Sequence, residues 1–247
     1  MDFLYQNEYL FFGSDIVDLS IEKDRSESKL IRYSKKICTE LELTILSKAK
    51  DIQEFEHWLL TIWSIKESSY KAAQRKNYDR RFRYREFEVK TGFDSVEDLI
   101  TGEQFSLTKF DLETAVISIA VLDSANRQLK NEPWRIVSWL DLNKESQSRA
   151  VRSQLRQILS NLANDQSIQP TVNRRTNQIG ELYPPELILD NQIFWVSFSH
   201  HGNYILTTLS IKYNSTKTSI LSELKLIWPT RSVVEKNEMI LFLPAEF

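Results

Sequence analysis

Apolar residues in the first half of the chain alternate between strand-like runs and a helical spacing. Residues 9–19 form an apolar run rich in β-branched and aromatic side chains, which predicts a strand with its loop. Between residues 49 and 75, apolar side chains return every three or four positions, which predicts an amphipathic helix. Three later segments show strand-like patterns: residues 82–90, 104–110 and 114–122.

The second half of the chain repeats this plan of one long helix and several strands. Residues 144–162 carry an apolar stripe that predicts the helix. Four shorter apolar runs predict strands: residues 134–140, 193–199, 204–211 and 239–243. We therefore expect an α+β protein of two similar halves, residues 1–125 and 126–247.

Composition narrows the class of protein. With 247 residues, 27% of them charged, and a net charge of −2, the chain is neither a strongly basic nucleic-acid binder nor an acidic disordered segment. Its single cysteine, Cys38, excludes an intramolecular disulfide framework and a multi-cysteine metal site. The sequence has no apolar run long enough to cross a membrane and no signal-like start, so we expect a cytoplasmic protein.

One carboxylate lies inside the first apolar run. Asp15 would be costly to bury without a partner. Strand alternation places Asp15 and Val17 on one face and Asp18 on the other. Asp15 is therefore either a turn or capping residue just after Gly13 or a metal ligand, and spacing alone leaves both interpretations open.

Two further groups of polar residues stand out. Glu67 and Lys71 lie four residues apart on the predicted helix, as in an ordinary exposed ion pair. Two of the three histidines, His200 and His201, follow Ser199 at the turn between two predicted strands. This run is either a polar hairpin tip or a site whose side chains donate to a phosphate.

Together, three segments resemble the signature of the 4′-phosphopantetheinyl transferases. Residues 13–17 (GSDIV) resemble the pattern G-x-D-I-V/E, and residues 197–200 (SFSH) resemble S-L/I/F-S-H. Residues 63–71 (WSIKESSYK) match W-S/T-x-K-E-S/A-x-x-K at every fixed position, which makes this motif the most specific. The motif order is similar to that of the short, holo-acyl-carrier-protein-synthase branch, whereas the length resembles the two-halved, pseudo-dimeric branch.

The resemblance implies a fold, a reaction and roles for five residues. Each half would be a long helix packed on a small antiparallel sheet. The enzyme would transfer 4′-phosphopantetheine from coenzyme A to a serine of an apo acyl or peptidyl carrier protein, for fatty-acid or polyketide synthesis, and would release 3′,5′-ADP. Asp15 and Glu67 would bind Mg²⁺, with Glu67 also the general base. Lys71 would stabilise the pyrophosphate, and Ser199 and His200 would bind a coenzyme A phosphate.

The sequence departs from the family's pattern in three places. Val17 stands where the two-halved branch has a second acid, so we expect two protein carboxylates on the metal. Glu181 follows Gly180 where the family has a lysine that helps to hold the 3′-phosphate, and His201 adds an imidazole that we interpret as a solvent-facing neighbour. Four arginines are candidates to replace that lysine: Arg152, Arg156, Arg174 and Arg175.

A cluster of cations follows the predicted helix. Between residues 75 and 85, Asp79 is the only acid among six basic residues: Arg75, Lys76, Arg80, Arg81, Arg83 and Arg85. The segment is either a solvated loop or a docking patch for an acidic carrier protein or the 3′-phosphate, and we expect no nucleic-acid partner.

The main competing hypothesis is a degenerate relative that binds coenzyme A or a carrier protein without catalysis. Val17 and Glu181 favour that hypothesis, whereas the intact set of Asp15, Glu67 and Lys71 favours an active enzyme. In a purely structural α+β interaction protein, the three motif matches would be coincidental.

Overall fold

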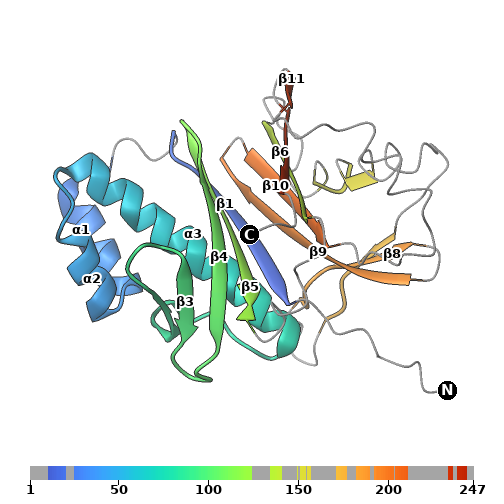
Figure 1. Ribbon diagram of the computed structural model, residues 1–247, viewed down its shortest axis with the longest axis horizontal. Helices are drawn as coiled ribbons and strands as arrows, with labels where there is room; N and C mark the ends of the chain where they lie inside the picture. Colours follow the sequence, from blue (N-terminus) through green and yellow to red (C-terminus); the bar gives the residue numbers. More distant parts are fainter. Residues whose placement is uncertain are drawn as a thin grey trace. The chain divides into compact units, whose positions relative to one another are not determined.

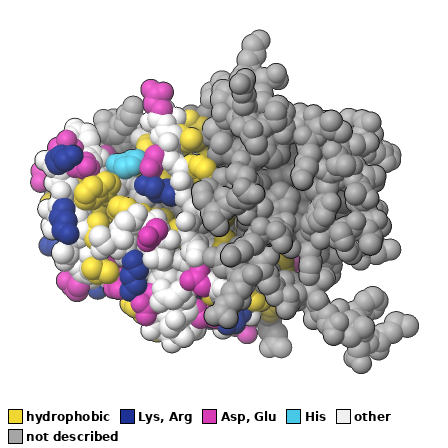
Figure 2. All heavy atoms as spheres, viewed as in Figure 1, with side chains coloured by type: hydrophobic (Ala, Val, Ile, Leu, Met, Phe, Trp, Pro, Cys, Tyr) yellow, Lys and Arg dark blue, Asp and Glu magenta, His cyan; other side chains and the backbone are white. Residues whose placement is uncertain are grey.

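The computed structural model describes residues 11–20, 25–123, 134–140, 149, 151–153, 155–156, 171–176, 182–189, 192–202, 204–210, 233–235 and 238–243. Contacts divide the chain into two units, Met1–Leu129 and Lys130–Phe247. Within the described ranges, no helix is long and apolar enough to cross a membrane. On the face that Figure 2 shows, acidic and basic side chains of the described residues are interspersed.

The first unit is built on a five-stranded antiparallel sheet. In spatial order its strands are β1 (Phe12–Asp18), β5 (Ala115–Leu122), β4 (Gln104–Asp111), β3 (Ser95–Asp98) and β2 (Phe87–Val89). β1 and β5 pair over the whole of β1, with Asp15 opposite Ser118. Every residue of these two strands is buried, which explains why their sequences read as nearly continuous apolar runs.

One long helix, α3 (Ile52–Lys76), packs against β1 and β5. It begins where the Asp51 side chain accepts a hydrogen bond from the Glu54 amide at 2.8 Å, and it ends in a basic turn that suits the negative end of the helix dipole. The predicted helix over residues 49–75 is confirmed. Figure 1 shows α3 between β1 and two shorter helices, α1 (Glu27–Ile37) and α2 (Glu40–Leu46).

Several short elements escape the hydrophobic pattern. α1, α2 and β3 were not predicted, and α2 begins at a capping box in which Thr39 and Glu42 satisfy each other's amides. The predicted strand over residues 82–90 is wrong at its start, because residues 84–86 form a 3₁₀ turn, η1 (Tyr84–Glu86), and only Phe87–Val89 is extended. Arg80 holds this turn through ion pairs with Glu86 and Asp98.

β1 approaches α3 unusually closely at Gly13. A Cβ atom on Gly13 would lie 2.1 Å from the carbonyl oxygen of Ser68 and 2.6 Å from the Cβ of Lys71. A side chain at this position would therefore push the strand away from the helix. Because strand positions alternate, the face that carries Gly13 also carries Asp15 and Val17, so both face α3.

The second unit contains a seven-stranded sheet. In spatial order its strands are β11 (Val233–Glu235), β12 (Glu238–Leu243), β6 (Trp134–Leu140), β10 (Tyr204–Ser210), β9 (Gln192–His201), β8 (Glu186–Leu189) and β7 (Thr171–Asn173). The predicted strand at 134–140, the hairpin and the last strand are confirmed, whereas β7, β8 and β11 were not predicted. Gly202 turns the hairpin with a φ of 59°, a conformation that favours glycine.

The helix predicted over residues 144–162 is described only in part. Residues 149, 151–153 and 155–156 are helical, and the remaining residues of the prediction lie outside the described ranges. Val151 packs against Ile205 and Phe198 of the β9–β10 hairpin, and Leu155 is fully buried. The predicted α+β class, with helix packed on antiparallel sheet, is therefore confirmed.

We expect Gly13→Ala to lower the free energy of unfolding by about 3 kcal/mol, because the new methyl group must displace the α3 backbone. Urea unfolding measures this loss. Gly102→Ala is the matched control, since it adds a methyl group with nothing within 4 Å but at a φ of +72°. That strain alone costs about 1 kcal/mol. Equal losses in the two variants would show that the close approach at Gly13 is unimportant.

Candidate functional site

A strand carboxylate and a helix ammonium meet where β1 crosses α3. The Nζ of Lys71 lies 2.8 Å from Oδ1 of Asp15 and donates a second hydrogen bond, 3.0 Å long, to the carbonyl oxygen of Ser14. Asp15 is only 6% exposed, so this contact compensates part of the cost of burying its charge. Lys71 therefore pairs with a carboxylate of β1 and does not belong to an exposed pair on the helix surface.

A second cation one turn further along α3 repeats this contact with β1. Arg75 is buried, stacks on the Phe12 ring and donates from Nε to the Phe12 carbonyl oxygen at 2.7 Å. Four helix residues advance about 6 Å and two strand residues about 6.6 Å, so the spacing from Lys71 to Arg75 matches the spacing from Ser14 back to Phe12. The two cations thus fix the register of the strand against the helix, with Gly13 between them.

Glu67 completes the group from one helical turn before Lys71. Burial and the negative charge of Asp15 raise the pKa of Glu67 to about 7, against the opposing effect of the Lys71 ammonium. The Lys71 ammonium is thus paired with Asp15, and its charge also acts on Glu67. A divalent cation would relieve the repulsion between Asp15 and Glu67, and oxygen ligands of this kind suit Mg²⁺.

The neighbours of Asp15 on β1 have other environments. Val17 faces α3 and is 1% exposed. Asp18 is buried on the other face, where its Oδ1 accepts hydrogen bonds from the amide and hydroxyl of Ser20 at 2.8 and 2.5 Å and closes the turn after the strand. Within the described part of the chain, no three histidine, cysteine, aspartate or glutamate residues gather as a metal-binding group.

A chain of buried hydroxyls lies beside this site. Ser118, opposite Asp15 in the sheet, is 2.7 Å from the Ser64 hydroxyl and donates to the Ser68 hydroxyl at 3.2 Å. These small side chains let β5 approach α3 and keep their own hydroxyls satisfied. Sequence analysis missed Ser118, although serines four residues apart on α3 are a signal for a close, polar helix face.

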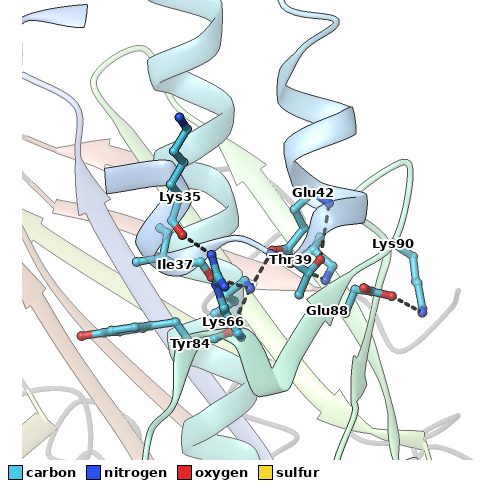
Figure 3. Close-up of polar contacts among 10 residues, drawn as sticks. Lys35, Ile37, Thr39, Glu42, Lys66, Tyr84, Glu88 and Lys90 are labelled. Atoms are coloured by element: carbon cyan, nitrogen blue, oxygen red, sulfur yellow. Dashed lines mark hydrogen bonds and ion pairs between the residues drawn. The ribbon is translucent and has the colours of Figure 1, made fainter. Parts of the chain in front are cut away.

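Lys66, another residue of the helix motif, lies away from this site. It is fully buried and pairs with Glu42 of α2 at 2.7 Å, as Figure 3 shows. Burial raises the pKa of Glu42 and lowers the pKa of Lys66, and the charge of each partner opposes these shifts. The motif therefore carries one lysine toward Asp15 and another into the core.

The serine–histidine run lies on β9 in the second unit. Ser199 is buried, His200 is exposed and His201 is half-buried. Adjacent strand residues point to opposite faces, so Ser199 and His200 do not share one. The assignment of these residues to coenzyme A remains a prediction.

The four candidate arginines also lie in the second unit, and all are exposed. Arg174 donates from Nε to the Tyr183 carbonyl oxygen at 3.0 Å, and Arg175 forms an ion pair with Glu186. Arg152 and Arg156 belong to the helical residues that the structure describes in this unit. Gly180 and Glu181 lie outside the described ranges.

The basic run after α3 is not one patch. The docking interpretation is wrong for Arg75, which is buried, and Lys76 pairs with Glu103 on the surface. Arg80 is mostly buried between Glu86 and Asp98. Arg81, Arg83 and Arg85 are exposed, with Arg83 lying 3.5 Å from Glu86.

The geometry defines an α+β protein whose site joins a strand aspartate to a helix glutamate and lysine. Residues 11–121 match the family model of the 4′-phosphopantetheinyl transferase superfamily. The resemblance inferred from the sequence motifs is therefore confirmed over these residues, which include Asp15, Glu67 and Lys71. The motif at residues 197–200 lies outside the matched segment.

Several solved chains are similar to part of this chain. The crystal structure of holo-(acyl-carrier-protein) synthase (AcpS) from Neisseria meningitidis aligns with 46% of this chain and 98% of its own, at 19% sequence identity and a TM-score of 0.34. No curated protein matches the chain.

We expect Glu67→Gln to stabilise the metal-free protein at pH 8 but to have little effect at pH 4.5. The folded state raises the pKa of Glu67 from 4.5 to about 7, so the folded state loses stability relative to the unfolded state as pH rises through this range. Above pH 7 the variant avoids a cost of up to about 3 kcal/mol.

Urea unfolding in the presence of EDTA at both pH values measures this effect. Glu113→Gln, an exposed position in the loop before β5, removes the same charge and controls for net charge. The interpretation fails if Glu67→Gln changes stability equally at both pH values.

Proposed function

We propose that this protein is a 4′-phosphopantetheinyl transferase. It would move the phosphopantetheine group of coenzyme A to a serine of an apo acyl or peptidyl carrier protein in the cytoplasm and release 3′,5′-ADP. The observation that carries the proposal is that Asp15, Glu67 and Lys71 meet on two elements inside a segment that matches this transferase superfamily.

Asp15 and Glu67 are the residues that would hold Mg²⁺. Magnesium favours one or two protein carboxylates together with substrate phosphates and water, and these two side chains fit that donor set. When bound, the ion would neutralise charge on the pyrophosphate of coenzyme A. Lys71, already bonded to Asp15, would contribute a second positive charge to the leaving phosphate.

Glu67 is suited to accept the proton of the carrier serine. Without a metal ion, burial and Asp15 raise the pKa of Glu67 to about 7; Mg²⁺ held at the same carboxylates would lower it again and keep the side chain ionised, which is the form that accepts a proton. In the transfer, the serine oxygen forms a bond to the β-phosphorus and its proton passes to Glu67. The phosphorus–oxygen bond of the pyrophosphate breaks, and 3′,5′-ADP leaves with the electron pair.

The second unit would supply contacts to coenzyme A. The exposed His200 would offer an imidazole to a coenzyme A phosphate, whereas the buried Ser199 would reach coenzyme A only from the other face of β9. Exposed arginines of the same unit would be available for the 3′-phosphate. The candidates for this contact with the 3′-phosphate are the four arginines named from the sequence: Arg152, Arg156, Arg174 and Arg175. The alternative is a relative that binds coenzyme A or a carrier protein without catalysis. Val17 favours this alternative, because it stands where the two-halved branch has a second acid.

A basic face of α1 extends the exposed part of the cationic run. Arg85 donates to the carbonyl oxygen of Lys35, which joins the segment after α3 to this helix. Ile31, 39% exposed, lies one helical turn before Lys35. The exposed basic residues of α1 are Lys29, Arg32, Lys35 and Lys36. We propose that this face and Arg85 dock an acidic helix of the carrier protein by charge complementarity.

Transfer is tested by incubating the protein with Mg²⁺, coenzyme A and an apo carrier protein, and weighing the carrier by mass spectrometry. We expect the carrier to gain one phosphopantetheine. Asp15→Asn, Glu67→Gln and Lys71→Ala should each lower the transfer rate by at least about 100-fold, because each removes a metal ligand, the base or a stabilising charge.

Glu113→Gln should leave the rate unchanged. If the carrier gains no mass while a competent control enzyme modifies it, the catalytic proposal is wrong. Retained binding of coenzyme A in that case would support the degenerate relative.

Docking is tested by charge reversal on α1. Lys29→Glu combined with Arg32→Glu should raise the KM for the carrier about 10-fold and leave the KM for coenzyme A within about twofold, because only the macromolecular contact is reversed. Lys48→Glu combined with Lys50→Glu, which reverses two exposed cations after α2, is the matched control. Equal effects of the two variants on the carrier KM would exclude this face.

A further inference from the structure

We propose that Lys66 is a positioning residue, whose buried ion pair with Glu42 sets the rotation of α3 and thereby places Glu67 beside Asp15. The inference rests on the proposed function, because it concerns the same carboxylate site. It separates the two lysines of the helix motif by role: Lys71 acts in the site, and Lys66 orients the helix that carries it.

Every proton of the Lys66 ammonium has an acceptor. Its Nζ pairs with Oε2 of Glu42 at 2.7 Å and donates to the carbonyl oxygens of Ile37 at 3.0 Å and Tyr84 at 2.9 Å. An ammonium has three donors, so the group is saturated, and its side chain is 0% exposed. The three acceptors belong to α2, the end of α1 and η1 (Figure 3), so one atom of α3 ties three other elements to the helix.

Glu42 is held as firmly on the other side of the pair. Its Oε2 also accepts from the Thr39 amide and its Oε1 accepts from the Val89 amide, each at 2.7 Å. The carboxylate therefore has a fixed orientation before Lys66 is considered. Because Val89 belongs to β2 and Thr39 caps α2, the ammonium is located relative to both a helix and the sheet.

The geometry of α3 connects this clamp to the site. Successive helix residues are about 100° apart, so Lys66 and Ser68 point to nearly opposite sides and Glu67 lies between them. Ser68 is fixed against β1 through Gly13 and against β5 through Ser118. The helix is thus held on two faces, and the direction of Glu67 depends on both.

Small rotations matter at this radius. A side-chain group about 5–6 Å from the helix axis moves about 1 Å for a 10° rotation of the helix. A misplacement of that size can lower a catalytic rate about 100-fold. The net stability of a buried ion pair is small compared with this effect on geometry, because desolvation cancels much of the attraction. An experiment can therefore separate the effect of the Lys66–Glu42 pair on the position of Glu67 from its effect on the stability of the protein.

The test uses a neutral replacement of the clamp, Glu42→Gln with Lys66→Met. The glutamine keeps one acceptor oxygen, so it can accept from either the Thr39 or the Val89 amide but not from both, and the double variant removes both charges of the pair together. The matched control is Lys76→Met with Glu103→Gln, which removes another lysine–glutamate pair of α3 on the surface. Val96→Ala, a core change in β3, controls for loss of stability alone.

Two quantities are measured on folded protein well below the unfolding temperature. The first is the affinity for Mn²⁺, followed by electron paramagnetic resonance, which reports whether Asp15 and Glu67 still converge. The second is kcat and KM for coenzyme A in the transfer assay. We expect the clamp variant to bind Mn²⁺ at least about 10-fold more weakly and to lose at least about 10-fold in kcat, with KM for coenzyme A within about twofold, and both controls to behave as wild type.

The outcomes separate this inference from the function on which it rests. Wild-type Mn²⁺ affinity and kcat in the folded clamp variant would overturn the positioning role and leave the proposed function intact. Equal losses in Val96→Ala would also overturn it, by showing that lowered stability is enough. If the double variant does not fold, Glu42→Gln alone provides the test: smaller losses in the same direction support the role, and none overturns it. A wild-type protein that neither binds Mn²⁺ nor transfers the group would refute the proposed function itself.

Discussion

The contact between β1 and α3 is the constraint on which the rest of the first unit depends. A glycine at position 13 allows the strand to approach the helix backbone, and two helix cations, Lys71 and Arg75, hold the strand in register by its carbonyl oxygens. Once this register is set, Asp15 faces the helix at the level of Glu67 and Lys71. The register that allows the close approach at Gly13 is therefore also the register that brings Asp15 to Lys71.

The site is assembled against an electrostatic cost. Asp15 is buried and Glu67 is partly buried, and the pKa of Glu67 rises to about 7 because burial and the negative charge of Asp15 disfavour a second negative charge. Lys71 offsets only part of this cost. The two carboxylates therefore lower the stability of the metal-free fold and at the same time favour the binding of a cation. Binding sites commonly lower the stability of the fold that carries them in this way.

Two lysines five residues apart in one motif have different physical roles. Lys71 is partly exposed and bonded to a strand carboxylate, whereas Lys66 is saturated by acceptors in the core. The two roles differ because the two side chains leave the helix in different directions, although the residue type is the same. The same holds for the cations after α3, where Arg75 supports β1 and Arg85 stays at the surface beside α1.

The amino-acid sequence by itself determined the long helix, the paired strands and the group of Asp15, Glu67 and Lys71, because strong periodicity and a specific motif are local signals. It did not reveal α1, α2, the 3₁₀ turn or the clamp around Lys66. The clamp depends on acceptors far apart along the chain, Glu42, Ile37 and Tyr84, which only the tertiary structure brings to one ammonium group. The start of α2 has a local signal, the capping box of Thr39 and Glu42, which the hydrophobic pattern does not include. The tertiary structure also decided that Gly13 is a point of contact, since a residue without a side chain carries no pattern of its own.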